Sequence, residues 1–232
     1  MTTIAIFGAG PALGTAVARR FGREGFRVGL VARDRPRLDG LVSQLADEGV
    51  EAAAFSADLV DRATTLAAAD AIERRFGPID ILAYNTVGRY EDLRRKPSQI
   101  DVAVMSRLAD TFVLTPVALV SRLLPGMLER GAGTLLFALG AAAKYPFPNL
   151  ASAGMAAAGL RSYVHTLHAE LAPEHVHAGA LVIGALIEGS AAHRNAAAWG
   201  TDLAVVSPDD LAERYWDMYL KRDRVEDEVT RT

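Results

Sequence analysis

Short apolar runs alternate with longer amphipathic segments along this chain. The apolar runs predict strands at Thr3–Phe7, Arg27–Val31, Ala52–Phe55, Ile79–Tyr84, Thr134–Leu139 and Ala178–Ile183. Helical periodicity lies between them, at Gly14–Glu24, Arg37–Glu48, Ala63–Phe76 and Ser152–Leu171. Strands that alternate with helices indicate right-handed βαβ units, and strands that are apolar throughout are typical of a sheet covered on both faces. The pattern predicts an α/β fold with a doubly wound, mostly parallel sheet and helices on both faces.

The C-terminal part of the chain carries one more helix signal. The run Ser207-Pro208-Asp209-Asp210 places a capping serine before a proline suited to the first helical position and acids suited to the first turn. We expect this helix to reach about Arg222 and the tail Arg224–Val229 to add an edge strand. Neither a repeat nor a linker interrupts the sequence, so residues 1–232 are predicted to form a single domain.

Composition argues against several classes of function. The net charge is −3, with both signs interspersed, which does not make the basic surface that nucleic acids require. The chain has no cysteine, and its five histidines lack the spacing of a zinc site, so no metal is expected. The first residues predict a strand rather than a signal peptide, and the apolar runs look too short to span a membrane. We therefore expect a cytoplasmic protein without a membrane partner.

A glycine-rich loop joins the first predicted strand to the first helix. Gly8 and Gly10 allow a tight turn and close backbone approach to a pyrophosphate, and Gly14 lets the helix pack closely on the strand. The helix N-terminus offers its N–H groups to phosphate. A glycine pattern by itself is weak, but its place between a strand and a helix supports a single Rossmann-type, dinucleotide-binding domain. The expected phosphate-binding residues are Gly8, Gly10, Pro11, Ala12, Leu13 and Gly14.

The end of the second predicted strand bears on the choice between NAD and NADP. An acid there hydrogen-bonds the 2′-hydroxyl of NAD in dinucleotide folds. Here Ala32 stands at that place and Arg33 follows, and a guanidinium is suited to the 2′-phosphate of NADP. Such a contact contributes roughly 1.5–3 kcal/mol, enough to decide between the two cofactors. The alternative is a solvated charged loop, because Asp34, Arg35 and Arg37 are adjacent. We favour NADP(H).

Over nearly its whole length the chain resembles the short-chain dehydrogenase/reductase family. The similar features are the Gly8–Gly14 loop, Asp58-Leu59, Asn85, Leu123-Leu124-Pro125-Gly126-Met127, Gly133-Thr134 and Pro146-Phe147-Pro148. By this resemblance Asp58 and Leu59 would lie at the adenine, Asn85 beside the cofactor, and Arg33 at the 2′-phosphate. Gly184 corresponds to the glycine that follows the sixth strand in the family, and it joins the expected cofactor-binding residues. Ala12 replaces the middle glycine of the family's loop.

The catalytic half of the sequence departs from the family. Family members use a serine, a tyrosine, a lysine and a helix asparagine, and the matching positions here are Gly140, Ala153, Ala157 and Phe112. A shift of register does not restore the pair, because Ser152–Leu160 contains neither tyrosine nor lysine. Loss of a general acid costs roughly 10²- to 10⁴-fold in rate, which an iminium or a conjugated enone tolerates better than a simple ketone.

Other polar side chains are available for the chemistry. Tyr145 comes first, because it lies on the loop after the fifth strand, and Ser152 comes second. The alternative for each of these side chains is a role without chemistry, either in packing the loop or as a solvated surface group. Further candidates are Lys144, Tyr84, Tyr90 and His193. An apolar substrate pocket would be lined by Phe112, Tyr145, Phe147 and Trp199.

Three functions stay open on these residues. The first is an NADP(H)-dependent oxidoreductase with an atypical active site, acting on a small apolar carbonyl, enone or imine. The second is a lyase, isomerase or cyclase without net redox chemistry, and the third is a non-enzymatic NADP(H)-binding sensor. By the family resemblance, the helix that begins with the alanine- and glycine-rich run Ala151–Gly159 would pack, with the helix around Leu114–Leu124, against other subunits of a homodimer or homotetramer.

Overall fold

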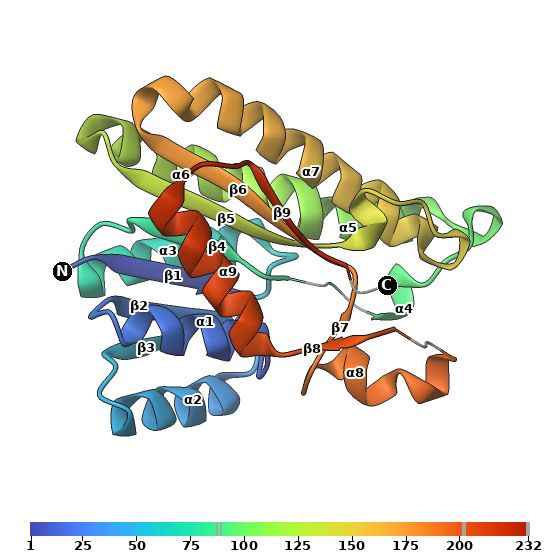
Figure 1. The fold of residues 1–232 in the computed structure, drawn as a ribbon, viewed down its shortest axis with the longest axis horizontal. Coiled ribbons are helices and arrows are strands. Elements are labelled where there is room, and N and C mark those ends of the chain that lie inside the picture. Colours follow the sequence, from blue (N-terminus) through green and yellow to red (C-terminus); the bar gives the residue numbers. More distant parts are fainter. Residues whose placement is uncertain (87, 89, 201–202, 231–232) are drawn as a thin grey trace.

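Within the described part of the chain, seven parallel strands form the central sheet in the order β3-β2-β1-β4-β5-β6-β9 (Figure 1). The computed structural model describes residues 1–86, 88, 90–200 and 203–230, and only the backbone of Trp199. The strands are β1 (Thr3–Phe7), β2 (Arg27–Ala32), β3 (Ala52–Ser56), β4 (Ile81–Tyr84), β5 (Gly133–Gly140), β6 (Val176–Ile183) and β9 (Glu226–Val229). The predicted doubly wound α/β fold is confirmed, and so is the predicted C-terminal edge strand.

Helices cover both faces of this sheet. The longer ones are α1 (Leu13–Gly22), α2 (Arg35–Asp47), α3 (Arg62–Phe76), α5 (Val102–Ala109), α6 (Thr115–Arg130), α7 (Ala151–Leu171) and α9 (Pro208–Lys221). Two short helices, α4 (Tyr90–Leu93) and α8 (Ala191–Asn195), and a small pair of strands, β7 (Leu186–Ile187) and β8 (Val205–Val206), lie beyond the carboxyl ends of the sheet strands. One buried cluster packs α1, α2 and α9 on one face, and another packs α3, α5, α6 and α7 on the other.

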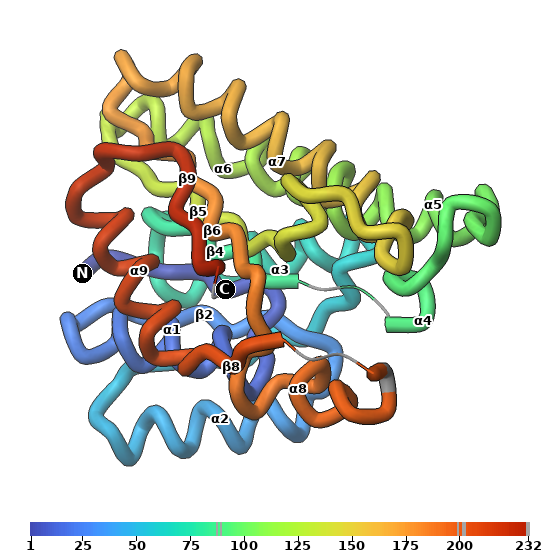
Figure 2. The backbone as a smooth tube through the Cα atoms, turned by 45° about the vertical axis from the view of Figure 1, so that its right-hand side comes forward, coloured from blue at the N-terminus to red at the C-terminus, as the bar shows by residue number. Residues whose placement is uncertain are grey.

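Local signals account for where several helices begin. Asp34 and Ser207 cap α2 and α9, since their side chains accept hydrogen bonds from the backbone N–H groups of Arg37 and Asp209. The cap at Ser207 is the one that the sequence predicts. After α9 the chain returns as β9, which lies beside β6 in both views of the backbone (Figure 2).

A continuous helical run from Val102 to Arg130 crosses the upper face of the sheet. It consists of α5, a π-helical turn η2 (Asp110–Leu114), and α6. Contrary to the sequence-based expectation, its length and mean hydropathy of 1.5 are sufficient for a membrane span by composition alone. In the fold, however, Leu108, Phe112 and Leu119 of this run are buried in the core cluster against the sheet, which accounts for the hydrophobicity of that side.

The strand order reverses between β1 and β4, because the chain winds outward from β1 in both directions. In open α/β sheets a ligand binds in the crevice outside the carboxyl ends of the strands at such a switch point. Phe7, the last residue of β1, pairs with Tyr84 at the end of β4. The residues that follow these two strands therefore meet at the expected ligand site.

Candidate cofactor and active site

A cleft of about 740 Å³ lies at this switch point. Most of the sequence-predicted cofactor residues line it, together with residues that follow β4 and β6. The predicted residues that it contains are Gly8, Gly10, Pro11, Ala12, Leu13, Gly14, Arg33, Asp58, Leu59 and Asn85. Its other lining residues include Arg37, Thr86, Gly88, Tyr90, Glu91, Thr111, Ile187, Ser190 and Ala191. The fold thus joins segments from five loops that the sequence places far apart.

The glycine-rich loop has the backbone that its sequence predicts. Gly8 has a φ of 90°, and a Cβ atom there would lie 2.8 Å from the backbone of Asn85. A Cβ at Gly14 would lie 2.8 Å from Cα of Ala9, so α1 packs directly on the loop. Ala12 caps α1 without a side-chain hydrogen bond in the described structure. The first N–H groups of α1 therefore face the cleft without a side-chain acceptor, as a phosphate site requires.

Two arginines stand at the part of the cleft that follows β2. Asp34 is used as the cap of α2, and Arg35 forms an ion pair with Asp39 at 2.8 Å. Among the described residues, the guanidinium groups of Arg33 and Arg37 have neither a hydrogen bond nor an ion pair. In the charged loop at 33–37, Asp34 and Arg35 thus have structural partners, whereas Arg33 and Arg37 line the cleft.

Asn85 provides a further test of whether the cleft fits a bound cofactor. Its Oδ1 accepts a hydrogen bond of 2.8 Å from the hydroxyl of Tyr215. Its Nδ2 is buried and has no partner in the described structure. A buried donor that lacks an acceptor is destabilising and is rare in folded proteins. An orphaned amide in a cleft that also has a phosphate loop and unpaired cations fits a ligand rich in acceptor oxygens.

Gly184 does not line the cleft, contrary to the sequence-based prediction. Its N–H donates to the carbonyl oxygen of Val229, 2.8 Å away. A Cβ at Gly184 would lie 3.1 Å from Thr230 and 3.5 Å from Ala141. The glycine therefore makes room for the C-terminal edge strand and its continuation, which cover the side of β6 at this position.

Ser152 is not available as a catalytic group, which corrects the second catalytic prediction. Its side chain is buried, and its hydroxyl donates to the backbone carbonyls of Asp92 and Leu93 at 2.6 and 3.0 Å. It does not line the cleft. The hydroxyl satisfies carbonyl groups at the end of α4, so Ser152 ties the start of α7 to that helix.

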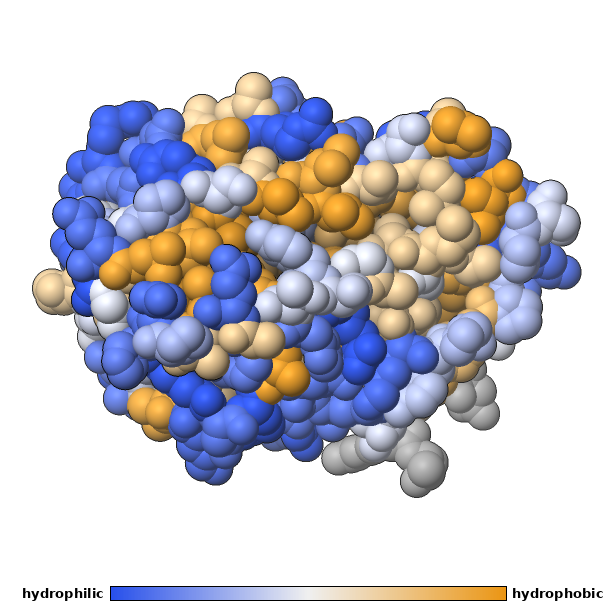
Figure 3. Space-filling view, turned by 90° about the horizontal axis from the view of Figure 1, so that it is seen from above, coloured by the Kyte–Doolittle hydropathy of each residue, from blue (hydrophilic) through white to orange (hydrophobic). Residues whose placement is uncertain are grey.

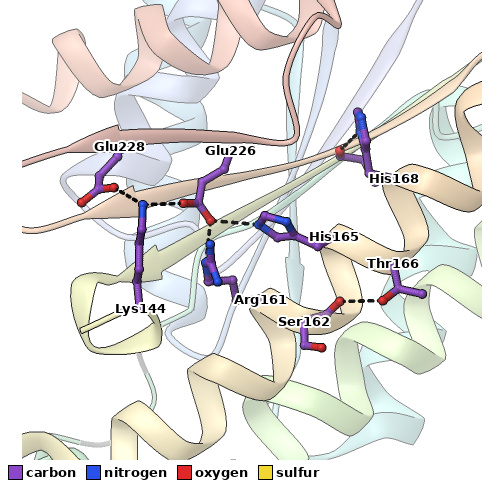
Figure 4. Close-up of polar contacts among 9 residues, drawn as sticks. Lys144, Arg161, Ser162, His165, Thr166, His168, Glu226 and Glu228 are labelled. Atoms are coloured by element: carbon purple, nitrogen blue, oxygen red, sulfur yellow. Dashed lines mark hydrogen bonds and ion pairs between the residues drawn. The ribbon is translucent and has the colours of Figure 1, made fainter. Parts of the chain in front are cut away.

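Tyr145 and Lys144 also lie outside the cleft. Lys144 belongs to a cluster of charged residues at the edge strand β9 (Figure 4). Lys144 forms ion pairs with Glu226 and Glu228, and Glu228 also accepts a hydrogen bond from Tyr145. The hydrogen bonds to Glu228 and Glu226 raise the pKa of Lys144, so it stays charged and is no base. The hydroxyl of Tyr145, the first catalytic candidate from the sequence, is therefore hydrogen-bonded to Glu228 and has a structural role.

Of the remaining candidates, Tyr90 is the one that lines the cleft. Tyr84 is buried, and its hydroxyl donates to the carbonyl of Thr111, which the π-helical turn leaves accessible, at 2.6 Å. His193 accepts through Nδ1 from the N–H of Gly189 at 3.2 Å. Burial raises the pKa of Tyr90, while a hydrogen bond from the backbone N–H of Ala192 and the charge of Arg194 act in the opposite direction.

The residues at the positions matched to the family's catalytic residues differ in burial: Ala157 is buried, whereas Gly140 is exposed. The short helical turn after β5 lies on α7, where a Cβ at Gly154 would lie 3.1 Å from the carbonyl oxygen of Ala142. Ala157 is 4% exposed. Of the residues predicted to line an apolar pocket, Phe112 is a core residue and Phe147 does not line the cleft. The side chain of Trp199, also predicted there, lies outside the described residues.

The comparisons with known proteins agree with this geometry. Residues 2–198 match the family model described as short chain dehydrogenase. Subunit BbsC of (2S)-[(R)-hydroxy(phenyl)methyl]succinyl-CoA dehydrogenase from Thauera aromatica is 30% identical over 184 residues, covering 77% of this chain and 70% of that protein. A short chain dehydrogenase from Pseudocercospora fijiensis is 28% identical over 171 residues, covering 73% of this chain. The match spans only 54% of the length of that fungal relative.

Solved structures share the fold over the whole chain. An actinorhodin polyketide ketoreductase variant with NADPH has a TM-score of 0.87 at 21% identity, covering 99% of this chain and 95% of its own. A short chain oxidoreductase from Pseudomonas aeruginosa PAO1, with NADPH bound and an atypical catalytic center, has a TM-score of 0.86 at 22% identity, with the same coverage of 99% and 95%.

Proposed function

The chain belongs to the short-chain dehydrogenase family, and from that premise we propose that it is an NADP(H)-dependent oxidoreductase with an atypical active site. The choice of cofactor depends on Arg33 and Arg37, which line the cleft after β2. Within the described structure their guanidinium groups make no hydrogen bond or ion pair. Two guanidiniums suit the 2′-phosphate dianion of NADP, whereas the 2′-hydroxyl of NAD needs an acceptor that Ala32 does not provide. Structures of similar fold that carry NADPH or NADP support the same assignment.

Binding and orientation are the tasks of the residues around the glycine-rich loop. The N-terminus of α1 and the backbone at Gly8–Gly14 bind the pyrophosphate, and Asp58 with Leu59 borders the adenine. Thr115 supports that wall, because its hydroxyl donates to the carbonyl oxygen of Leu59 at 2.9 Å. When bound, the nicotinamide supplies or accepts the hydride.

Proton transfer falls to Tyr90 in this proposal. Its phenol lines the cleft, and it accepts a hydrogen bond from the N–H of Ala192. That N–H and the positive charge of Arg194 stabilise the phenolate that forms when the proton leaves, which is what a general acid requires. Because Ser152–Leu160 carries neither the tyrosine nor the lysine of the family pattern, we expect modest catalysis on a small apolar carbonyl, enone or imine.

A binding titration followed by a turnover assay tests the proposal. Purified protein is titrated with NADPH and with NADH while cofactor fluorescence is followed, and we expect NADPH to bind at least tenfold more tightly. Equal affinity for the two cofactors would refute the assignment of the cleft to NADP(H). Turnover of imines, enones and ketones then separates the oxidoreductase from its alternatives. Tight NADPH binding without hydride transfer to any of them would favour a sensor or a non-redox lyase, isomerase or cyclase.

The proposal extends to the domain organisation, the location and the oligomeric state of the protein. We propose that residues 1–232 form one cofactor-binding domain, that the protein is cytoplasmic, and that it assembles into a homodimer or homotetramer without nucleic acid or membrane partners. The assembly is tested by sedimentation, as described in the Discussion.

A further inference from the structure

Tyr215 connects the last helix of the chain to the cofactor cleft. It lies on α9, is fully buried, and donates its hydroxyl to Oδ1 of Asn85, 130 residues away in sequence, at 2.8 Å. Burial raises the pKa of Tyr215 well above its usual value, so the phenol stays protonated and acts as a donor. In the structure the phenol donates and the amide oxygen accepts.

The backbone of Asn85 is also held in place. Its N–H donates to the carbonyl oxygen of Phe7 at 2.8 Å, and Gly8 approaches its carbonyl group closely on the other side. The freedom that remains to Asn85 is rotation of its carboxamide. Because Tyr215 takes Oδ1, this rotation is fixed and the amide nitrogen must occupy the opposite side.

The amide nitrogen of Asn85 is the group left without a partner. Nδ2 is buried and makes no hydrogen bond in the described structure, although Asn85 lines the cleft. We propose that Tyr215 is a positioning residue, which orients the Asn85 carboxamide so that its N–H₂ donates to an acceptor of the bound cofactor. This inference rests on the proposed function, since it requires NADP(H) in the cleft.

The sheet order indicates which half of the cofactor Asn85 meets. Arg33 follows β2, on one side of β1, whereas Asn85 follows β4, on the other side. A dinucleotide bound across the switch point extends from one side to the other. With the 2′-phosphate at Arg33, Asn85 lies towards the nicotinamide half.

Two ligands and three variants test the inference. The ligands are NADPH and adenosine 2′,5′-bisphosphate, which carries the 2′-phosphate but lacks the nicotinamide half. Tyr215→Phe removes only the hydroxyl, and Asn85→Asp keeps an acceptor for Tyr215 while removing the N–H donor. The control Tyr219→Phe makes the same change one turn later on α9, where the ring packs against Phe21 and Phe26 away from the cleft. Affinities are measured by calorimetry on cofactor-free protein, and folding is checked by circular dichroism.

We expect Tyr215→Phe to weaken NADPH binding about three- to tenfold and Asn85→Asp to weaken it about tenfold or more, from the size of single hydrogen bonds. Binding of the bisphosphate should stay within twofold of wild type in both variants, and Tyr219→Phe should change neither affinity. The double variant should bind NADPH no more weakly than Asn85→Asp alone, because Tyr215 acts through Asn85.

Several results would overturn the inference. A folded Tyr215→Phe that binds NADPH as wild type does would remove the positioning role, and so would an equal loss for both ligands or additive losses in the double variant. If Tyr215→Phe does not fold, the Asn85→Asp variant decides. An unchanged NADPH affinity in that variant would show that the Asn85 amide does not bind the cofactor, and the positioning role would be refuted. Failure of the proposed cofactor assignment looks different, since wild-type protein would then bind neither NADPH nor the bisphosphate.

Discussion

Nζ of Lys144 lies 3.0 Å from Oε1 of Glu226, so the loop after β5 is tied to the edge strand β9 (Figure 4). The other oxygen of the same carboxylate lies 2.6 Å from Nε of Arg161 and 2.9 Å from Nε2 of His165, both on α7. Burial would by itself raise the pKa of Glu226, but the hydrogen bonds from Arg161, His165 and Lys144 outweigh it and lower the pKa to about 2. The C-terminal strand is thus fastened to the loop after β5 and to α7.

The Glu226 cluster predicts a loss of stability in acid. A carboxyl group whose pKa is lower in the folded state stabilises that state above its unfolded pKa, near 4.3, and the contribution disappears as the pH falls towards about 2. We expect Glu226→Gln to lower the free energy of unfolding by about 1–2 kcal/mol at pH 7, after allowance for screening by solvent. Urea unfolding at pH 7 and pH 3 measures it. A difference between wild type and variant that does not shrink at pH 3 would contradict the interpretation.

The arginines at the adenosine end predict a selective loss of NADPH affinity. Arg33→Ala should weaken NADPH binding roughly ten- to hundredfold and leave NADH binding unchanged, since only NADPH carries the 2′-phosphate. Arg37→Ala should have the same selectivity with a smaller effect. Arg35→Ala is the matched control, because Arg35 is paired with Asp39 and does not line the cleft. Fluorescence titration measures all three, and an equal loss for NADH in Arg33→Ala would speak against a phosphate contact.

The missing catalytic residues predict a particular order of substrates. Simple ketones should be reduced slowly and iminium or enone compounds faster, because the latter need less proton donation. Tyr90→Phe should lower ketone reduction about tenfold or more while changing iminium reduction little. Tyr145→Phe, whose partner is Glu228, should leave both rates unchanged. Steady-state rates of NADPH oxidation measure this, and robust ketone reduction by Tyr90→Phe would mean that another group supplies the proton.

The small residues of α7 have a role within the subunit as well as a proposed one between subunits. Gly154 accommodates Ala142, and Ala156 is 4% exposed, so bulky substitution of Ala156 would stop folding rather than report on assembly. Apolar and small residues nevertheless form a band across the face seen from above in Figure 3, the side of α6 and α7. Met155 on α7 is 59% exposed, and Leu114, the last residue of η2 before α6, is 45% exposed. Such exposure of large apolar side chains is typical of a surface that binds another subunit.

Charged substitution on this face should therefore separate the subunits. We expect wild-type protein to sediment as a dimer or tetramer at micromolar concentration, and Met155→Lys combined with Leu114→Lys to sediment as smaller species that remain folded. Leu203→Lys, 49% exposed but remote in the chain from both helices, is the control and should leave the assembly intact. A monomeric wild type would disprove the proposed interface.

Local patterns in the chain were sufficient to predict the strands, the glycine-rich loop and the cation at the adenosine end. Each depends on a periodicity or on a backbone conformation that neighbouring residues set, such as the positive φ at Gly8 or the cap at Ser207. For the same reason the absence of tyrosine and lysine from Ser152–Leu160 can be read directly from the sequence, whereas its consequence for catalysis stays a prediction. The C-terminal edge strand, an acidic segment near the end of the chain, was also predicted from its local sequence.

The partners of the polar side chains, in contrast, were decided only when the chain folded. Ser152 meets Asp92 across 60 residues, Lys144 meets Glu226 across 82, and Tyr215 meets Asn85 across 130. A serine, a lysine and a tyrosine look equally free in a sequence, because their reactivity depends on burial and on the groups within hydrogen-bonding distance. Tertiary packing assigned the first two to structural bonds, and it brought the third, from the last helix of the chain, into hydrogen-bonding distance of Asn85, which lines the cleft.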